Sequence, residues 1–67
     1  MDFASARARV GLSQTEVARR LGIDQSSVSC WELGKRMPRA AMLVKLSELY
    51  CCTIDELMGR DTGKDSA

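Results

Sequence analysis

The stretch Gln14–Leu33, with the sequence QTEVARRLGIDQSSVSCWEL, decides how the rest of this chain can fold. Apolar residues recur in it at helical spacing twice, first at Val17 and Leu21 and then at Val28 and Trp31. A Gly-Ile-Asp tripeptide interrupts the periodicity between the two patterns. Glycine adopts the left-handed backbone conformation that a tight turn needs. The stretch therefore predicts two short helices joined by a glycine turn, with Trp31 packed in the core.

The residues at the ends of these two helices support the same boundaries. Ser13 and Glu16 have the spacing of a capping box, in which the hydroxyl and the carboxylate each accept a hydrogen bond from a free backbone amide. Gly22 is expected to end the first helix with a positive φ. Asp24 is a good N-cap for the second helix, which we expect to span residues 25–33.

Three further helices are expected outside the central stretch, which makes the chain all-α with five helices. One begins after Asp2, one follows the chain's single Pro at position 38, and the last begins at a second capping box, Thr53 to Glu56. Their apolar faces contain Phe3, Ala6, Val10, Met42, Leu43, Leu46, Leu49, Tyr50, Ile54, Leu57 and Met58. We expect residues 1–59 to form one domain and residues 60–67 to be a flexible polar tail.

The composition describes a small foldable domain with an uneven distribution of charge. The chain has 67 residues, of which 45% are hydrophobic and 28% charged, and its net charge is only +1. Residues 1–45 carry eight Lys or Arg against four acids, a net charge of +4, whereas residues 46–67 carry two against five, a net charge of −3. A basic half suits a polyanionic partner, and ordinary surface charge is the alternative.

Several functional classes lack the residues that they need. The chain has three Cys and no His, so it offers no zinc-ligand spacing, and we expect neither a metal nor another cofactor. No nucleophile has a base at a recognisable spacing, so an enzyme is not expected. We find no signal peptide, membrane span or evident small-molecule ligand. Reduced thiols at all three Cys and a cytoplasmic location are therefore expected.

A longer signature, GLSQTEVARRLGIDQSSVSCWELGKRMP at residues 11–38, is followed by a leucine-rich helix and by TIDELM at residues 53–58. With these motifs the chain resembles the phage Cro/repressor-type helix-turn-helix family, also called the Xre family, over residues 6–58. The resemblance implies a compact five-helix, lambda-repressor-like domain that binds operator DNA, often as a dimer. Cys51 and Cys52 depart from the family pattern, because relatives commonly carry Gly and Val there.

The outward face of the predicted helix 25–33 is nearly uncharged. With Val28 and Trp31 inward, the residues left facing outward are Gln25, Ser26, Ser29 and Cys30, with Ser27 at the flank. They form a stripe that could lie along the major groove of double-stranded DNA. A Gln side chain can pair with the N6 and N7 edge of adenine, and similar phage repressors use the residue matching Gln25 in this way. Cys30 could contact a thymine methyl group. A solvated polar face is the alternative.

Phosphate contacts are expected beside that face. Gln14 begins a helix, where its side chain and the free amides can meet a phosphate, as the resemblance also implies. Lys35, Arg36 and Arg39 follow the predicted recognition helix and would attract DNA of any sequence, with Ser27 beside them. From the resemblance, Arg7 should pair with Glu32, and Arg7 could also donate to a phosphate. Solvated surface residues are the alternative at each of these positions.

These observations favour a sequence-specific DNA-binding transcriptional regulator, a repressor, that recognises a short palindromic operator through the helix at residues 25–33. A weak homodimer would place two such helices in successive major grooves. Ile54, Leu57 and Met58 are the residues expected at its interface. The alternative function is a protein-interaction module of the same fold, such as an antitoxin, although the polar residues after Met58 form a short extension for wrapping a toxin.

Overall fold

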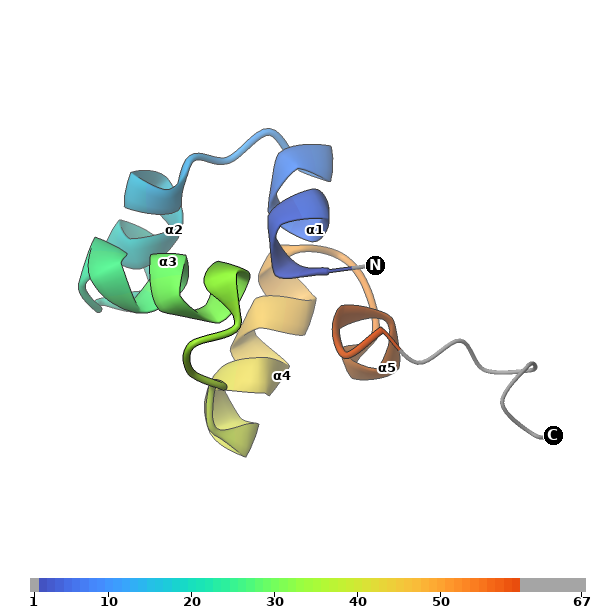
Figure 1. Ribbon diagram of the computed structural model, residues 1–67. Coiled ribbons are helices and arrows are strands. Elements are labelled where there is room, and N and C mark those ends of the chain that lie inside the picture. Colours follow the sequence, from blue (N-terminus) through green and yellow to red (C-terminus); the bar gives the residue numbers. More distant parts are fainter. Residues whose placement is uncertain (1, 60–67) are drawn as a thin grey trace, which may run out of the picture.

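The computed structural model describes residues 2–59 of the chain, so the expected polar tail at residues 60–67 lies outside the described residues. Residues 2–59 contain helices and no strand, in agreement with the predicted all-α class. The helices are α1 (Phe3–Arg9), α2 (Gln14–Leu21), α3 (Gln25–Leu33), α4 (Ala40–Leu49) and α5 (Ile54–Leu57). In Figure 1, α2 and α3 lie side by side at one end of the molecule, and α5 lies on the other side of α4.

The helices enclose a single small core. α2 packs against α3, α1 against α3, and α4 against α5. The buried hydrophobic residues of the core come from all five helices and the end of α4: Phe3, Ala6, Val17, Ala18, Val28, Leu46, Tyr50 and Leu57. Trp31 is only partly buried and packs against this core, as do Met42, Leu43 and Leu49. The predicted core is confirmed for these residues, whereas Trp31 lies nearer its edge than expected and Ile54 and Met58 are half-buried outside it.

The two central helices begin and end where the sequence predicts. Gly22 and Gly34 follow α2 and α3 in the left-handed conformation, with φ of 71° and 79°. In each case the amide of the glycine donates to a carbonyl of the preceding turn. α3 can therefore leave α2 at a sharp angle and lie across it (Figure 1).

The predicted caps of α2 and α3 are only partly correct. Ser13 Oγ accepts from the backbone amide of Glu16 at 3.0 Å, which confirms one half of the capping box. The reciprocal half is wrong, because the Glu16 carboxylate binds Arg19 and Arg20 instead. Asp24 stands at the N-cap position of α3, but its side chain makes no capping hydrogen bond. By contrast, α5 has a complete capping box.

The corner between α4 and α5 has an unusual backbone. Cys51 has a φ of +56°, the only positive φ outside glycine in the described part of the chain. It occupies the position where relatives are expected to carry Gly. Arg9 reaches over from α1, and its Nη2 donates to the carbonyls of Tyr50 at 3.1 Å and Cys51 at 3.0 Å. These bonds hold the corner to α1.

All three cysteines are free thiols, as predicted. Cys51 is exposed, whereas Cys30 and Cys52 are half-buried. No helix within residues 2–59 has both the length and the apolar character needed to cross a membrane.

Candidate nucleic-acid interface

The first turn of α3 presents the most accessible of the predicted base-reading residues. Gln25 and Ser26 are exposed, whereas Ser29 and Cys30 are half-buried along the next turn. Val28 faces the core with 1% of its surface exposed. Of the four predicted base-reading residues, Gln25 and Ser26 are therefore the most accessible, whereas Ser29 and Cys30 keep only part of their surface accessible.

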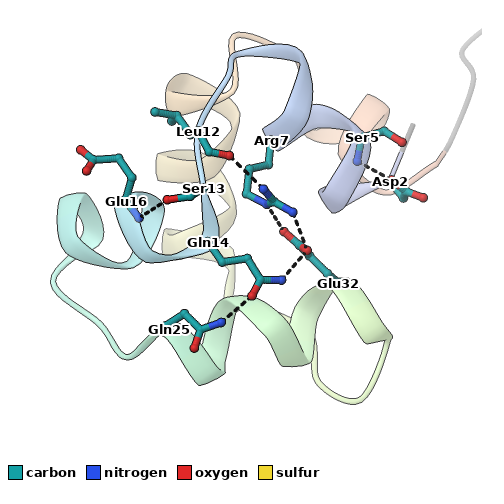
Figure 2. A network of polar contacts seen from close by, with 9 residues as sticks. All are labelled: Asp2, Ser5, Arg7, Leu12, Ser13, Gln14, Glu16, Gln25 and Glu32. Carbon is teal, nitrogen blue, oxygen red and sulfur yellow. Dashed lines mark hydrogen bonds and ion pairs between the residues drawn. The ribbon is translucent and has the colours of Figure 1, made fainter.

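Gln25 is held by the other glutamine that the sequence singles out. Gln25 Nε2 donates a hydrogen bond to Gln14 Oε1, so the first residues of α2 and α3 are joined through their side chains. Figure 2 shows the two amides in line, with Gln14 reaching past the start of α2 toward α3. Gln14 was predicted to contact phosphate and Gln25 to contact a base, and the structure brings the two together.

Glu32, near the end of α3, anchors this glutamine pair. Its carboxylate accepts from Gln14 Nε2 at 2.7 Å through Oε1. The same carboxylate also accepts hydrogen bonds from two nitrogens of the Arg7 guanidinium, from Nε at 2.5 Å and from Nη2 at 3.2 Å. The predicted ion pair between Arg7 and Glu32 is therefore confirmed. A continuous chain of contacts runs from α1 through Glu32 and Gln14 to Gln25 (Figure 2).

The contact between Arg7 and Glu32 is largely shielded from water. The Glu32 side chain is 7% exposed and that of Arg7 is 20% exposed, so water competes little with their contact. The hydrogen bond to Glu32 raises the pKa of Arg7 above its usual value. Burial, followed by the nearby Glu32 carboxylate, raises the pKa of Tyr50 to about 12, which keeps that phenol neutral at physiological pH.

Arg7 has little of its donor capacity left for DNA. Besides the two bonds to Glu32, its Nη1 donates to the Leu12 carbonyl at 2.9 Å. All three guanidinium nitrogens are thus engaged within the protein. The geometry supports the structural role of Arg7 more strongly than the predicted phosphate contact.

The predicted cationic flank lies in the loop between α3 and α4. Lys35, Arg36 and Arg39 are all exposed. The amides of Lys35 and Arg36 donate to the Cys30 carbonyl, which closes the end of α3 and fixes the start of this loop. Ser27, Arg36 and Arg39 line one groove of about 310 Å³, together with Trp31 and parts of α4. Three of the residues predicted to contact phosphate are therefore neighbours, while Lys35 lies outside that groove.

The residues predicted at a dimer interface occupy different environments. Leu57 is 2% exposed and belongs to the core, so its side chain is not available to a second molecule. Ile54 and Met58 are half-buried and keep part of their surface accessible. Of the three residues predicted at the interface, Ile54 and Met58 therefore remain accessible to a second molecule.

Sequence reasoning missed two features of this region. It assigned Glu32 to the Arg7 pair but not to Gln14, which lies 18 positions earlier in the chain. It also did not foresee that Leu33 and Met37, at 66% and 59% exposure, leave apolar surface at the end of α3. The spacing of Leu33 from the inward residues of the helix, especially Val28, was the available signal for its exposure.

Comparison with known proteins gives one family and several relatives. A family model described as helix-turn-helix matches residues 3–57. The chain is 39% identical over 56 residues to the transcriptional regulator ImmR of Bacillus subtilis (strain 168), covering 84% of this chain and 44% of that protein. It is 35% identical over 52 residues to the transcriptional activator BcrR of Enterococcus faecalis, covering 78% of this chain and 26% of that protein.

A third relative comes from a phage. The chain is 33% identical over 58 residues to the cryptic phage CTXphi transcriptional repressor RstR of Vibrio cholerae, covering 87% of this chain and 52% of that protein. The chain thus spans about half the length, or less, of these three relatives. All three are named as transcription regulators, in agreement with the prediction that the chain is not an enzyme.

Proposed function

The chain belongs to the Xre-type helix-turn-helix family, and on this premise we propose that it is a sequence-specific transcriptional regulator that binds double-stranded DNA. α3 lies in the major groove in this proposal, with its first turn against the base edges. The observation that carries the proposal is the contact between Gln14 and Gln25, because it joins the position predicted to contact phosphate to the one predicted to contact a base.

The glutamine pair suits this task chemically. Gln25 uses one N–H for Gln14 and keeps its amide oxygen and a second N–H for a base. Gln14 uses one N–H for Glu32 and keeps another for a phosphate oxygen. Each glutamine can therefore contact DNA without giving up the contact that positions it.

The exposed cations supply the attraction that the first turn of α3 lacks. Lys35, Arg36 and Arg39 follow α3 and would neutralise phosphates on either side of the groove, releasing counterions whatever the sequence. Ser27 is placed to donate to the same backbone, since it shares a groove with Arg36 and Arg39. The loop thus contributes affinity, while Gln25 contributes discrimination.

We further propose that the protein binds as a weak homodimer to a palindromic operator, with Ile54 and Met58 at the contact. Two recognition helices then enter successive major grooves on one face of the duplex, about 34 Å apart. We propose that the protein represses transcription, because a protein that occupies a promoter can block it with its DNA-binding surface alone. We propose the cytoplasm as the place where this function is carried out.

Selection of binding sites from random duplex DNA, using the full chain, tests the proposal. We expect enrichment of a short inverted repeat whose half-sites are about one helical turn apart. Enrichment of isolated half-sites would contradict the dimer while leaving base reading intact. A selected pool without any consensus would contradict sequence-specific binding altogether. A titration of salt on the selected site should show log affinity falling linearly with log salt.

A further inference from the structure

Both carboxylate oxygens of Glu32 are hydrogen-bond acceptors and cannot be anything else while the side chain is ionised. Oε2 accepts from Arg7 Nε, and Oε1 accepts from Arg7 Nη2 and from Gln14 Nε2. The Arg7 guanidinium, which has only donors, pairs with this carboxylate and holds it in place. Glu32 therefore differs from the glutamines that it supports, whose amides can present either a donor or an acceptor.

This chemistry fixes the direction of the two glutamine amides. Because Glu32 only accepts, Gln14 must turn its nitrogen toward it, which leaves Gln14 Oε1 toward α3. Because that oxygen only accepts, Gln25 must turn its own nitrogen toward Gln14. Glu32 thus sets the direction of the Gln14 amide, and the Gln14 amide oxygen in turn sets the direction of the Gln25 amide.

We propose that Glu32 is a specificity-determining positioning residue, which makes Gln25 prefer adenine by fixing the direction of both amides. The proposal rests on the proposed function. Held as it is, Gln25 offers a base one acceptor and one donor, which match the N6 donor and N7 acceptor of adenine. Guanine presents two acceptors at the same positions, N7 and O6. In the reverse direction, Gln25 would offer two N–H groups, and these match guanine.

Glu32→Gln is the direct test, because it replaces one oxygen of the carboxylate by an amide nitrogen at nearly constant shape. Arg7 Nε makes the shorter contact and retains the amide oxygen, so the amide nitrogen faces Gln14. The directions of Gln14 and Gln25 then reverse. The measurement is the ratio of dissociation constants for operators with guanine or adenine at the position that Gln25 contacts.

The wild-type protein should favour adenine by roughly 5- to 150-fold, the range for one bidentate pair. In Glu32→Gln we expect the ratio to fall below about twofold or to reverse in favour of guanine. A Glu32→Gln protein that folds, as judged by circular dichroism, and keeps the wild-type ratio would overturn the proposal. If this variant does not fold, Gln14→Met removes the link from Glu32 to Gln25 while leaving the Arg7 pair. It should lower the ratio too, and an unchanged ratio there would equally overturn the proposal.

Two controls separate this effect from others. Arg7→Lys weakens the ion pair but keeps the Glu32 carboxylate, so it should lower stability and preserve the adenine preference. A loss of preference in Arg7→Lys equal to that in Glu32→Gln would contradict the proposal, since general loosening would explain both. Gln25→Ala must abolish the preference at that position. If it does not, base reading by Gln25 is wrong, a failure distinct from that of Glu32.

Discussion

Two arginines on α1, two positions apart, hold different parts of the molecule together. Arg7 pairs with Glu32 and donates to the Leu12 carbonyl, which ties α1 to α3 and to the start of α2. Arg9 instead donates to two carbonyls at the α4–α5 corner, those of Tyr50 and Cys51. Hydrogen bonds from charged donors are each worth roughly 1.5–3 kcal/mol where water is excluded and less at an exposed site such as Arg9. Both residues thus serve the fold more than they serve an external anion.

Cys51 offers a test at the scale of a single backbone angle. Its φ of +56° destabilises the folded state of any residue that has a Cβ, by about 1–2 kcal/mol. Replacement by Gly removes this strain, but Gly also increases the conformational entropy of the unfolded chain, which offsets part of the gain. We therefore expect Cys51→Gly to raise the free energy of unfolding by roughly 0.5–1 kcal/mol, measured by urea denaturation.

Gly22→Ala is the matched substitution, and it should change the free energy of unfolding in the opposite direction. Gly22 has a φ of +71° and open space around the position of a Cβ, so Gly22→Ala introduces backbone strain without a clash. It should lower the free energy of unfolding by about 1 kcal/mol. If Cys51→Gly were destabilising while Gly22→Ala behaved as expected, packing by the Cys51 side chain would outweigh its backbone strain.

At the scale of one element, α2 carries a surface ion-pair cluster that competes with its cap. Arg19 lies three positions after Glu16 and Arg20 four positions after it, so both reach the Glu16 carboxylate on the helix surface. The hydrogen bond from Arg19, followed by that from Arg20, lowers the pKa of Glu16 from 4.5 to about 2. Hydrogen bonds from these two cations stabilise the carboxylate more than one hydrogen bond from the neutral backbone amide of Ser13 would.

The lowered pKa gives α2 a defined sensitivity to acid. A carboxylate whose pKa falls on folding stabilises the folded state above the unfolded value, here 4.5, and that stabilisation is lost as pH falls toward about 2. We expect the difference in melting temperature between the wild-type protein and Glu16→Gln to shrink over this interval. The effect should be small and reduced by salt, because the pairs are exposed. A difference that stays constant from pH 6 to pH 2 would argue against the cluster.

Local sequence signals predicted the elements well, because helix boundaries depend on near neighbours. Gly22 and Gly34 ended α2 and α3 at the expected residues. The full capping box at Ser13 was wrong because the pattern does not weigh competing arginines one turn away. At the site, the resemblance gave the Arg7–Glu32 pair. The bond between Gln14 and Glu32 depends on how α2 crosses α3, and no local pattern encodes that crossing.

In the molecule as a whole, the contacts within the protein decide which of the positive charges can attract DNA. The basic half of the sequence holds eight Lys or Arg, but four of these are engaged within the protein. The engaged residues are Arg7, Arg9, Arg19 and Arg20. Among the others, Lys35, Arg36 and Arg39 are gathered in the loop after α3. Attraction to DNA should therefore come mainly from one loop beside the base-reading turn, not from the whole basic half.

Gln25 is proposed to discriminate between bases, and the adjoining loop to supply the sequence-independent attraction. The most direct measurement compares Gln25→Ala with Lys35→Ala, by equilibrium binding to the selected operator and its single-base variants at several salt concentrations. Gln25→Ala should cost about 1–3 kcal/mol on the operator and relax the preference at one base position, with the salt dependence unchanged. Lys35→Ala should weaken binding to all sequences alike. It should also reduce the steepness with which log affinity falls against log salt by about 1. An equal loss of affinity for every sequence in Gln25→Ala would instead show that Gln25 does not read a base.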